Sequence, residues 1–186
     1  MNFEKYTDKS KAIIEAAQAL ALRSSHQQFT PEHMLSALLD DKDRITDKLI
    51  RACGGVPVRV AEEVEQSLAK MPKVSGSPQL YITPETARFF DMAEQVSSKA
   101  KDEYITVERL LQALSMITGS QAAKILSAAG VTPQKINAAI ADMRKGRLAT
   151  SANAEDQFEA LKKYTKDFTA LASEGKLDPV IGRDEE

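Results

Sequence analysis

The stretch FTPEHMLSALL (residues 29–39) decides the fold, because the chain repeats it as ITVERLLQALS at residues 105–115. The two copies lie at an offset of 76 positions, which sets residue 106 against residue 30 and needs no gap from Thr7 to Pro57. Identical pairs at this offset include Thr7/Thr83, Ala17/Ala93, Thr30/Thr106, Glu32/Glu108, Leu35/Leu111, Gly54/Gly130 and Pro57/Pro133. Two copies are too few for a solenoid, which needs about three repeats. The sequence therefore predicts a compact pair related by a pseudo-twofold axis, with repeat 1 over residues 1–70 and repeat 2 over residues 82–144.

The pattern within each copy predicts four short helices. A threonine precedes each of the first two helices in both copies, where its hydroxyl oxygen can accept an unpaired amide of the first turn. Gly54 and Gly130 end the third helices, because glycine tolerates the left-handed turn that follows a helix. Pro57 and Pro133 then occupy the favoured first position of the fourth helices. No segment alternates long enough to predict a strand, so the expected fold class is all-α, a duplicated four-helix unit of eight helices.

The character of the chain changes after Arg144. Residues 145–154 (KGRLATSANA) are small and polar, which is typical of a flexible linker. An amphipathic run follows, with Phe158, Leu161 and Tyr164 at helical spacing. A single helix of this kind is marginal in water, so residues 155–186 are expected to begin a second domain that continues beyond this chain.

Composition excludes several classes of function. The 25 basic and 27 acidic residues leave a net charge of −2, which does not suit a phosphate backbone, so no nucleic-acid partner is expected. The charged start is no signal peptide, and the longest apolar stretch, residues 16–22, is too short to span a membrane. Cys53 is the only cysteine and permits no intrachain disulfide. These features predict a soluble, cytoplasmic protein.

No constellation of residues indicates catalysis. None of the glycines begins a phosphate-binding GxxxxGK[ST] pattern. His26 and His33 are seven positions apart with no cysteine cluster nearby, so they are expected to be solvated surface residues and no metal site is predicted. Cys53 pairs with Ala129 in the repeat and is expected to be a small packed residue. We therefore expect no catalytic residue and no bound cofactor in this stretch of chain.

The end of the chain carries a family resemblance. ALKKYT (residues 160–165) and GKLDPVIGRDEE (residues 175–186) resemble the entry to the first ATPase domain of the Clp/heat-shock AAA+ unfoldases. FEKYTDKSK (residues 3–11) and FTPEHMLSALL are most similar to the disaggregase branch of that family. The resemblance implies a Clp N-terminal domain over residues 1–144 and a truncated AAA+ domain over residues 155–186.

The resemblance also implies a function. It is that of the substrate-binding N-terminal domain of an ATP-dependent chaperone, which disaggregates and unfolds heat-damaged proteins with the DnaK system. Its partners would be unfolded or aggregated polypeptides, and the full-length parent would be a hexamer that uses ATP and Mg²⁺, whereas the fragment would be a monomer. The alternative is an adaptor- and substrate-docking N-domain of a protease-linked unfoldase of the ClpA or ClpC type. An enzyme with an unrecognised site and a purely structural role in hexamer assembly also stay open.

Site residues follow from the same resemblance. Polar positions that matter in the family correspond to Thr7, Thr83, Asp102 and Glu108, and Phe90, Val96 and Leu110 are candidates for an apolar floor. Val180 and Ile181 correspond to a segment near the adenine of the full-length parent. A groove at the junction of the repeats, rimmed by helix N-termini, would hold an extended apolar segment. In this account Asp102 and Glu108 are surface carboxylates, and helix capping is the alternative role of the threonines.

Overall fold

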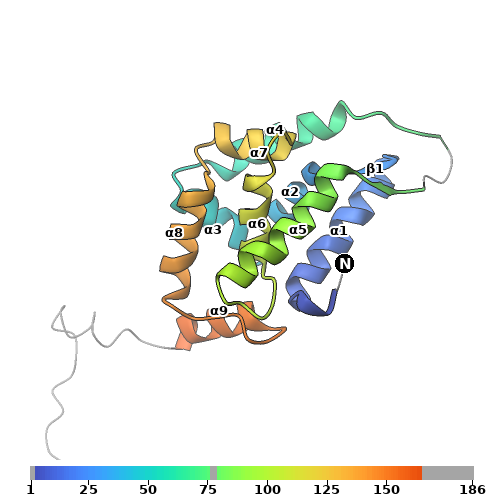
Figure 1. Ribbon diagram of the computed structural model, residues 1–186. Helices are drawn as coiled ribbons and strands as arrows, with labels where there is room; N and C mark the ends of the chain where they lie inside the picture. The colour runs from blue at the N-terminus through green and yellow to red at the C-terminus, as the bar shows by residue number, and fades with distance from the viewer. Residues whose placement is uncertain (1–2, 76–78, 165–186) are drawn as a thin grey trace, which may run out of the picture. The chain divides into compact units, whose positions relative to one another are not determined.

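The computed structural model describes residues 3–75 and 79–164, with side chains as far as residue 160. A short 3-10 turn (Phe3–Lys5) precedes repeat 1, which comprises α1 (Asp8–Arg23), α2 (Pro31–Leu39), α3 (Ile45–Ala52) and α4 (Pro57–Ala69). Repeat 2 comprises α5 (Pro84–Lys99), α6 (Val107–Met116), α7 (Gln121–Ala128) and α8 (Pro133–Arg144) (Figure 1). The predicted all-helical, duplicated four-helix fold is confirmed.

Several helix boundaries have the predicted chemical cause. The hydroxyl oxygens of Thr7 and Thr83 accept the amides of Ser10 and Thr86, which caps α1 and α5. Gly54 and Gly130 follow the third helices with φ angles of +86° and +75°, a conformation in which other residues are strained. Thr30 and Thr106 stand at the predicted N-cap positions, but their hydroxyls bond to side chains, those of His33 and Arg144.

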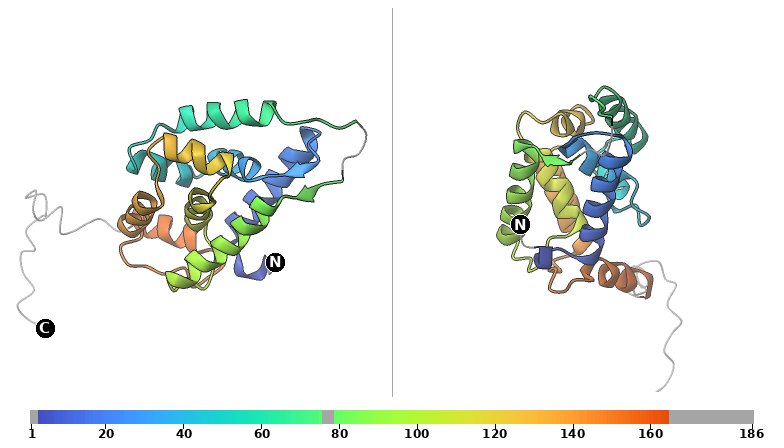
Figure 2. Two further views of the ribbon diagram at one scale, coloured as in Figure 1. Left: turned by 45° about the horizontal axis from the view of Figure 1, so that its top comes forward. Right: turned by 90° about the vertical axis from the view of Figure 1, so that its right-hand side faces the viewer.

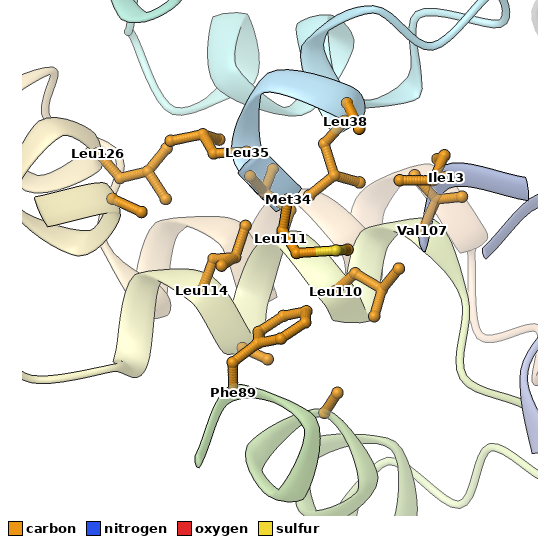
Figure 3. Packing of buried hydrophobic residues seen from close by; sticks show 14 of the residues in the cluster. Ile13, Met34, Leu35, Leu38, Phe89, Val107, Leu110, Leu111, Leu114 and Leu126 are labelled. Carbon is orange, nitrogen blue, oxygen red and sulfur yellow. The ribbon is translucent and has the colours of Figure 1, made fainter. Parts of the chain in front are cut away.

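The core lies where the two second helices meet. Figure 3 shows Met34, Leu35 and Leu38 of α2 opposite Leu110, Leu111 and Leu114 of α6. All six side chains are fully buried, and each α2 residue is the repeat equivalent of one in α6. Ile13 of α1 and its equivalent Phe89 of α5 pack into the same cluster. The junction of the repeats, where a groove was expected, is therefore filled by side chains at these residues.

Short extended segments cross from one repeat to the other, a feature that the sequence pattern did not predict. β1 (Gln28–Phe29) pairs in parallel with β2 (Tyr81–Ile82), bringing Phe29 beside Ile82 (Figure 2). The equivalent contact is a parallel bridge between Tyr6 and Ile105. In both contacts, a residue just before the first helix of one repeat pairs with a residue just before the second helix of the other repeat. Two residues are too few to produce a visible alternation, which is why no strand was expected.

The end of the domain differs from the predicted boundary at Arg144. The chain divides into two units, Met1–Glu155 and Asp156–Glu186. Residues 145–154 were expected to form a flexible linker, yet Ala149 is fully buried and its amide donates to Asp102 over 2.9 Å. Their small side chains allow this close packing of main chain on helix ends, a possibility that composition does not reveal.

The last described element is α9 (Ala154–Tyr164), where the amphipathic run was expected. Val180 and Ile181 lie outside the described residues. Along the part of the chain that the structure describes, no helix is both long and apolar enough to cross a bilayer.

Candidate functional site

Asp102 and Glu108, two of the predicted site residues, meet in a buried cluster of charges. Asp102 accepts hydrogen bonds from Arg109 Nε (2.9 Å) and Arg144 Nη1 (2.8 Å). Glu108 accepts from Arg144 Nε over 3.1 Å, and Thr106 accepts from Arg144 Nη2 over 2.6 Å. The side chains of Asp102 and Glu108 are 0% and 1% exposed, so the expectation of surface carboxylates is wrong. Two arginines pair with these carboxylates, which makes their burial tolerable.

Thr7 lies at the other side of this cluster, at the start of α1. Its hydroxyl donates to Glu155 Oε1 over 2.7 Å, and the amide of Val107, the first residue of α6, donates to the same oxygen over 3.0 Å. Glu155 therefore caps α6 from a distance of 48 residues in sequence, at the positive end of the helix dipole. Thr7 is fully buried beneath it. Glu155 was not among the predicted site residues, and no sequence pattern points to it.

The carboxylates of Glu108 and Glu155 lie close enough in this cluster to repel each other. Burial, with a smaller contribution from the charge of Glu108, raises the pKa of Glu155 to about 7. The hydrogen bonds from Thr7 and Val107 act in the opposite direction. The second oxygen of each carboxylate, Oε2 of Glu108 and Oε2 of Glu155, is buried without a hydrogen-bond partner. Burying the unbonded Oε2 of Glu155 therefore lowers the free energy of unfolding of the domain.

Thr83 does not join this cluster but occupies the equivalent place in the other half of the domain. Its amide donates to the carbonyl of Phe29 over 3.3 Å, just as the amide of Thr7 donates to Ile105 over 3.1 Å. Thr86 also donates its hydroxyl to Phe29 over 2.7 Å. Thr83 is half-buried, whereas Thr7 is inaccessible. The predicted polar set is thus two sites, one at the starts of α1 and α6 and one at the starts of α5 and α2.

The two histidines are the repeat equivalents of Asp102 and Arg109, and they were wrongly expected at the surface. His26 and His33 are buried, with Nδ1 of His26 2.9 Å from Nε2 of His33. The amide of Thr30 donates to Nδ1 of His33, so Nε2 carries the proton and donates to His26. Burial, aided by His26, lowers the pKa of His33 to about 4. Repeat 1 therefore holds a neutral pair where repeat 2 holds an ion pair.

The three candidate floor residues are parts of the core. Leu110 is fully buried, and Phe90 and Val96 are 3% and 7% exposed. Phe90 packs against Phe89 with ring centroids 4.8 Å apart. A hollow of about 620 Å³ lies at the end of α5, but its lining is mostly polar, includes Ser97, Lys101 and Asp102, and contains none of the three candidates.

An apolar groove lies instead within repeat 1, between α1 and α4 and over α2. It has a volume of about 850 Å³. Its apolar lining includes Ala12, Ile13, Ala16, Leu20, Ala61 and Val64. Leu68, the repeat equivalent of Arg144, also lines the groove, and charged side chains such as Lys9, Arg23, Asp40 and Lys73 line it too. The exposed alanines of α1 and α4 leave room beside these helices, but the sequence does not show which of its alanines are exposed.

The duplicated helical fold, with paired threonine-capped helix starts, defines a class of small all-helical repeat domains. Within that class the chain belongs to a known family. The family model described as Clp repeat (R) N-terminal domain matches residues 5–129.

Named relatives narrow the comparison. The chain is 53% identical to "Chaperone protein ClpB" of Rhodopseudomonas palustris over 188 residues and 51% identical to the protein of that name from Brucella suis. Each match covers the whole of this chain but only 21% of the relative, so the chain spans about a fifth of their length. Its fold is similar to that of the Hsp104 N-terminal domain from Candida albicans, with a TM-score of 0.71 and 21% identity, covering 81% of this chain and 98% of that one.

Proposed function

We propose that this chain is the client-binding N-terminal part of an ATP-dependent chaperone that disaggregates damaged proteins, and that its client is an unfolded polypeptide. The open apolar groove of repeat 1 carries this proposal. Clients of such a chaperone are recognised by what folded proteins conceal, namely extended chain with exposed apolar side chains. A groove between two helices accepts this chemistry without requiring a particular sequence.

The size of the groove agrees with this role. Pockets that hold ligands range from about 300 to about 1,000 Å³. The groove, at about 850 Å³, accommodates a few residues of client rather than a folded surface. A contact of this size is weak, with a dissociation constant of about 10 μM to 1 mM. Weak contact suits a domain that must pass its client on.

Polar contacts would supplement the groove. We propose that Thr83, at the starts of α5 and α2, and the cluster of Thr7, Asp102 and Glu108 bond to the main chain or basic side chains of a client. Helix starts present amides and carboxylates present acceptors, so together they match both kinds of group on an extended chain. Phe90, Val96 and Leu110 would support these sites from the core.

The remaining properties concern the full-length protein. We propose that it is a cytoplasmic hexamer that uses ATP and Mg²⁺ and cooperates with the DnaK system. Support comes from relatives named as chaperones that match the whole of this chain, including its AAA+-like end. The same names give no support to a protease-linked unfoldase.

A matched pair of alanine substitutions tests the groove. Ala16 lines the groove on α1, and Ala87 is an exposed residue of α5 outside it. Ala16→Glu would place a larger, charged side chain in the groove beside its apolar lining, and we expect affinity for reduced, carboxymethylated α-lactalbumin to fall by at least about tenfold. Ala87→Glu should bind like wild type. Equal binding by the two variants, measured by fluorescence anisotropy, would refute a role for the groove.

A further inference from the structure

Residues 145–155, here called the strap, cover the polar cluster with hydrogen bonds from their main chain. The amide of Ala149 donates to Asp102 Oδ1 over 2.9 Å, and its carbonyl accepts from the amides of Glu103 and Tyr104 over 2.9 and 3.1 Å. The carbonyl of Ala152 accepts from the amide of Asp8, at the start of α1, over 2.8 Å. An extended client could make these same bonds, since they use only main-chain groups.

Glu155 completes the strap with a side-chain anchor. Its Oε1 accepts from Thr7 and Val107 and so occupies the starts of α1 and α6 together. These are the positions at which the proposed polar client contacts lie. The strap therefore sits where a client would sit.

The other half of the domain shows the same position without such an occupant. Thr83 is the repeat equivalent of Thr7 and has the same backbone bond to the opposite repeat, yet it remains half-exposed. The difference between Thr7 and Thr83 is thus not a property of the fold. It arises from what the chain places over each of them.

We propose that the strap is an intramolecular occupant of the polar cluster and that a client must displace it to reach Thr7, Asp102 and Glu108. This inference rests on the proposed function, because it assigns regulation to the proposed client site. Displacement turns residues 145–155 from packed chain into tether, so a bound client lengthens the connection between the N-terminal domain and the residues that follow.

The strap can separate from the domain without exposing much apolar surface. Ala149 and Ala154 are its buried apolar residues, and each contributes only a methyl group, whereas Leu148 is 45% exposed. Its main anchor, Glu155, leaves one oxygen buried without a partner beside Glu108. Polar bonds that a client can replace hold most of it, and little apolar surface is lost when it opens.

Amide hydrogen exchange of the full 186-residue chain tests the proposal directly. The amide of Ala149 belongs to the strap and donates to Asp102, so its exchange reports whether the strap is docked. Saturation with reduced, carboxymethylated α-lactalbumin should speed its exchange by about tenfold or more. Client binding that leaves the Ala149 amide unchanged or slower would overturn the strap proposal and leave the client-binding function intact.

A pair of variants supplies the second arm. Glu155→Ala removes the anchor, whereas Asp142→Ala removes an exposed carboxylate of α8, outside the strap. A client binds only molecules whose strap is open, so a larger open fraction raises the apparent affinity. Glu155→Ala should therefore bind the client about three- to tenfold more tightly, and Asp142→Ala should match wild type. Binding by Glu155→Ala that is equal to or weaker than wild type would mean that Glu155 serves stability alone. Absence of binding by every variant would refute the client-binding function together with the strap.

Discussion

Arg144 and Asp102 form the central ion pair of the domain, with Nη1 of the guanidinium 2.8 Å from both carboxylate oxygens. The equivalent residues of repeat 1 are Leu68 and His26, both of which line the apolar groove. The two repeats therefore share one fold but carry different side chains at these two positions. Repeat 2 places a buried ion pair at these positions, and repeat 1 places a leucine and a neutral histidine there, beside its groove.

The ion pair makes Asp102 a stability residue. Asp102→Ala leaves Arg144 and Arg109 buried without their shared partner and should lower the free energy of unfolding by about 3–5 kcal/mol. Asp142→Ala, at an exposed position of α8, should change it by less than about 0.5 kcal/mol. Denaturation by urea measures both. Similar values for the two variants would show that the ion pairs of Asp102 make no net contribution to stability. The binding of Asp102→Ala must be measured at a temperature at which this variant is still folded.

Glu155 should give stability an unusual dependence on pH. Its pKa is about 7 in the folded chain and near 4.5 when unfolded, so the folded state binds more protons between these values. Stability from this group therefore falls as pH rises from about 4.5 to about 7, by about 1–3 kcal/mol. Glu155→Gln cannot ionise, and its stability relative to wild type should rise across that window. A constant difference between the two proteins would contradict the raised pKa.

His33 should act in the opposite direction over an overlapping range. Its pKa is about 4 when folded and 6.5 when unfolded, so the unfolded state binds more protons between these values. Stability from His33 therefore rises as pH increases from about 4 to about 6.5 and is lost as pH falls. Nitrogen NMR of the imidazole should show a neutral ring, protonated at Nε2, at pH 6. A charged His33 at that pH would refute the buried neutral pair.

Gly55 should prove intolerant of a side chain. A Cβ atom there would lie 2.9 Å from Ile50 Cγ2 of its own repeat and 2.9 Å from Val131 Cγ2 of the other. Gly55→Ala should therefore lower the free energy of unfolding by about 1–3 kcal/mol through overpacking between the repeats. Val56→Ala, at the next and exposed position, is the control. Thermal unfolding in which Gly55→Ala matches the control would show that this contact relaxes freely.

The repeat made most of the fold predictable. Identical residues at one offset predicted paired helices, and Thr7, Thr83, Gly54 and Gly130 begin and end helices where their chemistry requires. Local patterns succeed here because caps and turns depend on a few neighbouring residues. The prediction that His26 and His33 lie at the surface was wrong because burial depends on what packs over a side chain, which their spacing in the sequence does not reveal.

The site was harder to predict for the same reason. Arg144 bonds to Asp102 across 42 residues of sequence, and Glu155 bonds to Thr7 across 148, so no local pattern points to either partner. The family resemblance grouped Thr83 with Thr7, but the pseudo-twofold axis places these equivalent residues at two separate sites. The groove escaped notice since its alanines differ from core alanines only in exposure.

Nuclear magnetic resonance with a spin-labelled client tests the central claim most directly. Reduced, carboxymethylated α-lactalbumin carrying a nitroxide should broaden the amide signals of Ala12, Ala16 and Ala61, which line the groove on α1 and α4. Ala87, exposed on α5 away from the groove, should keep its signal. Broadening centred on α1 and α4 is the result that a client-binding groove predicts. Uniform broadening, or none at saturating client, would contradict it.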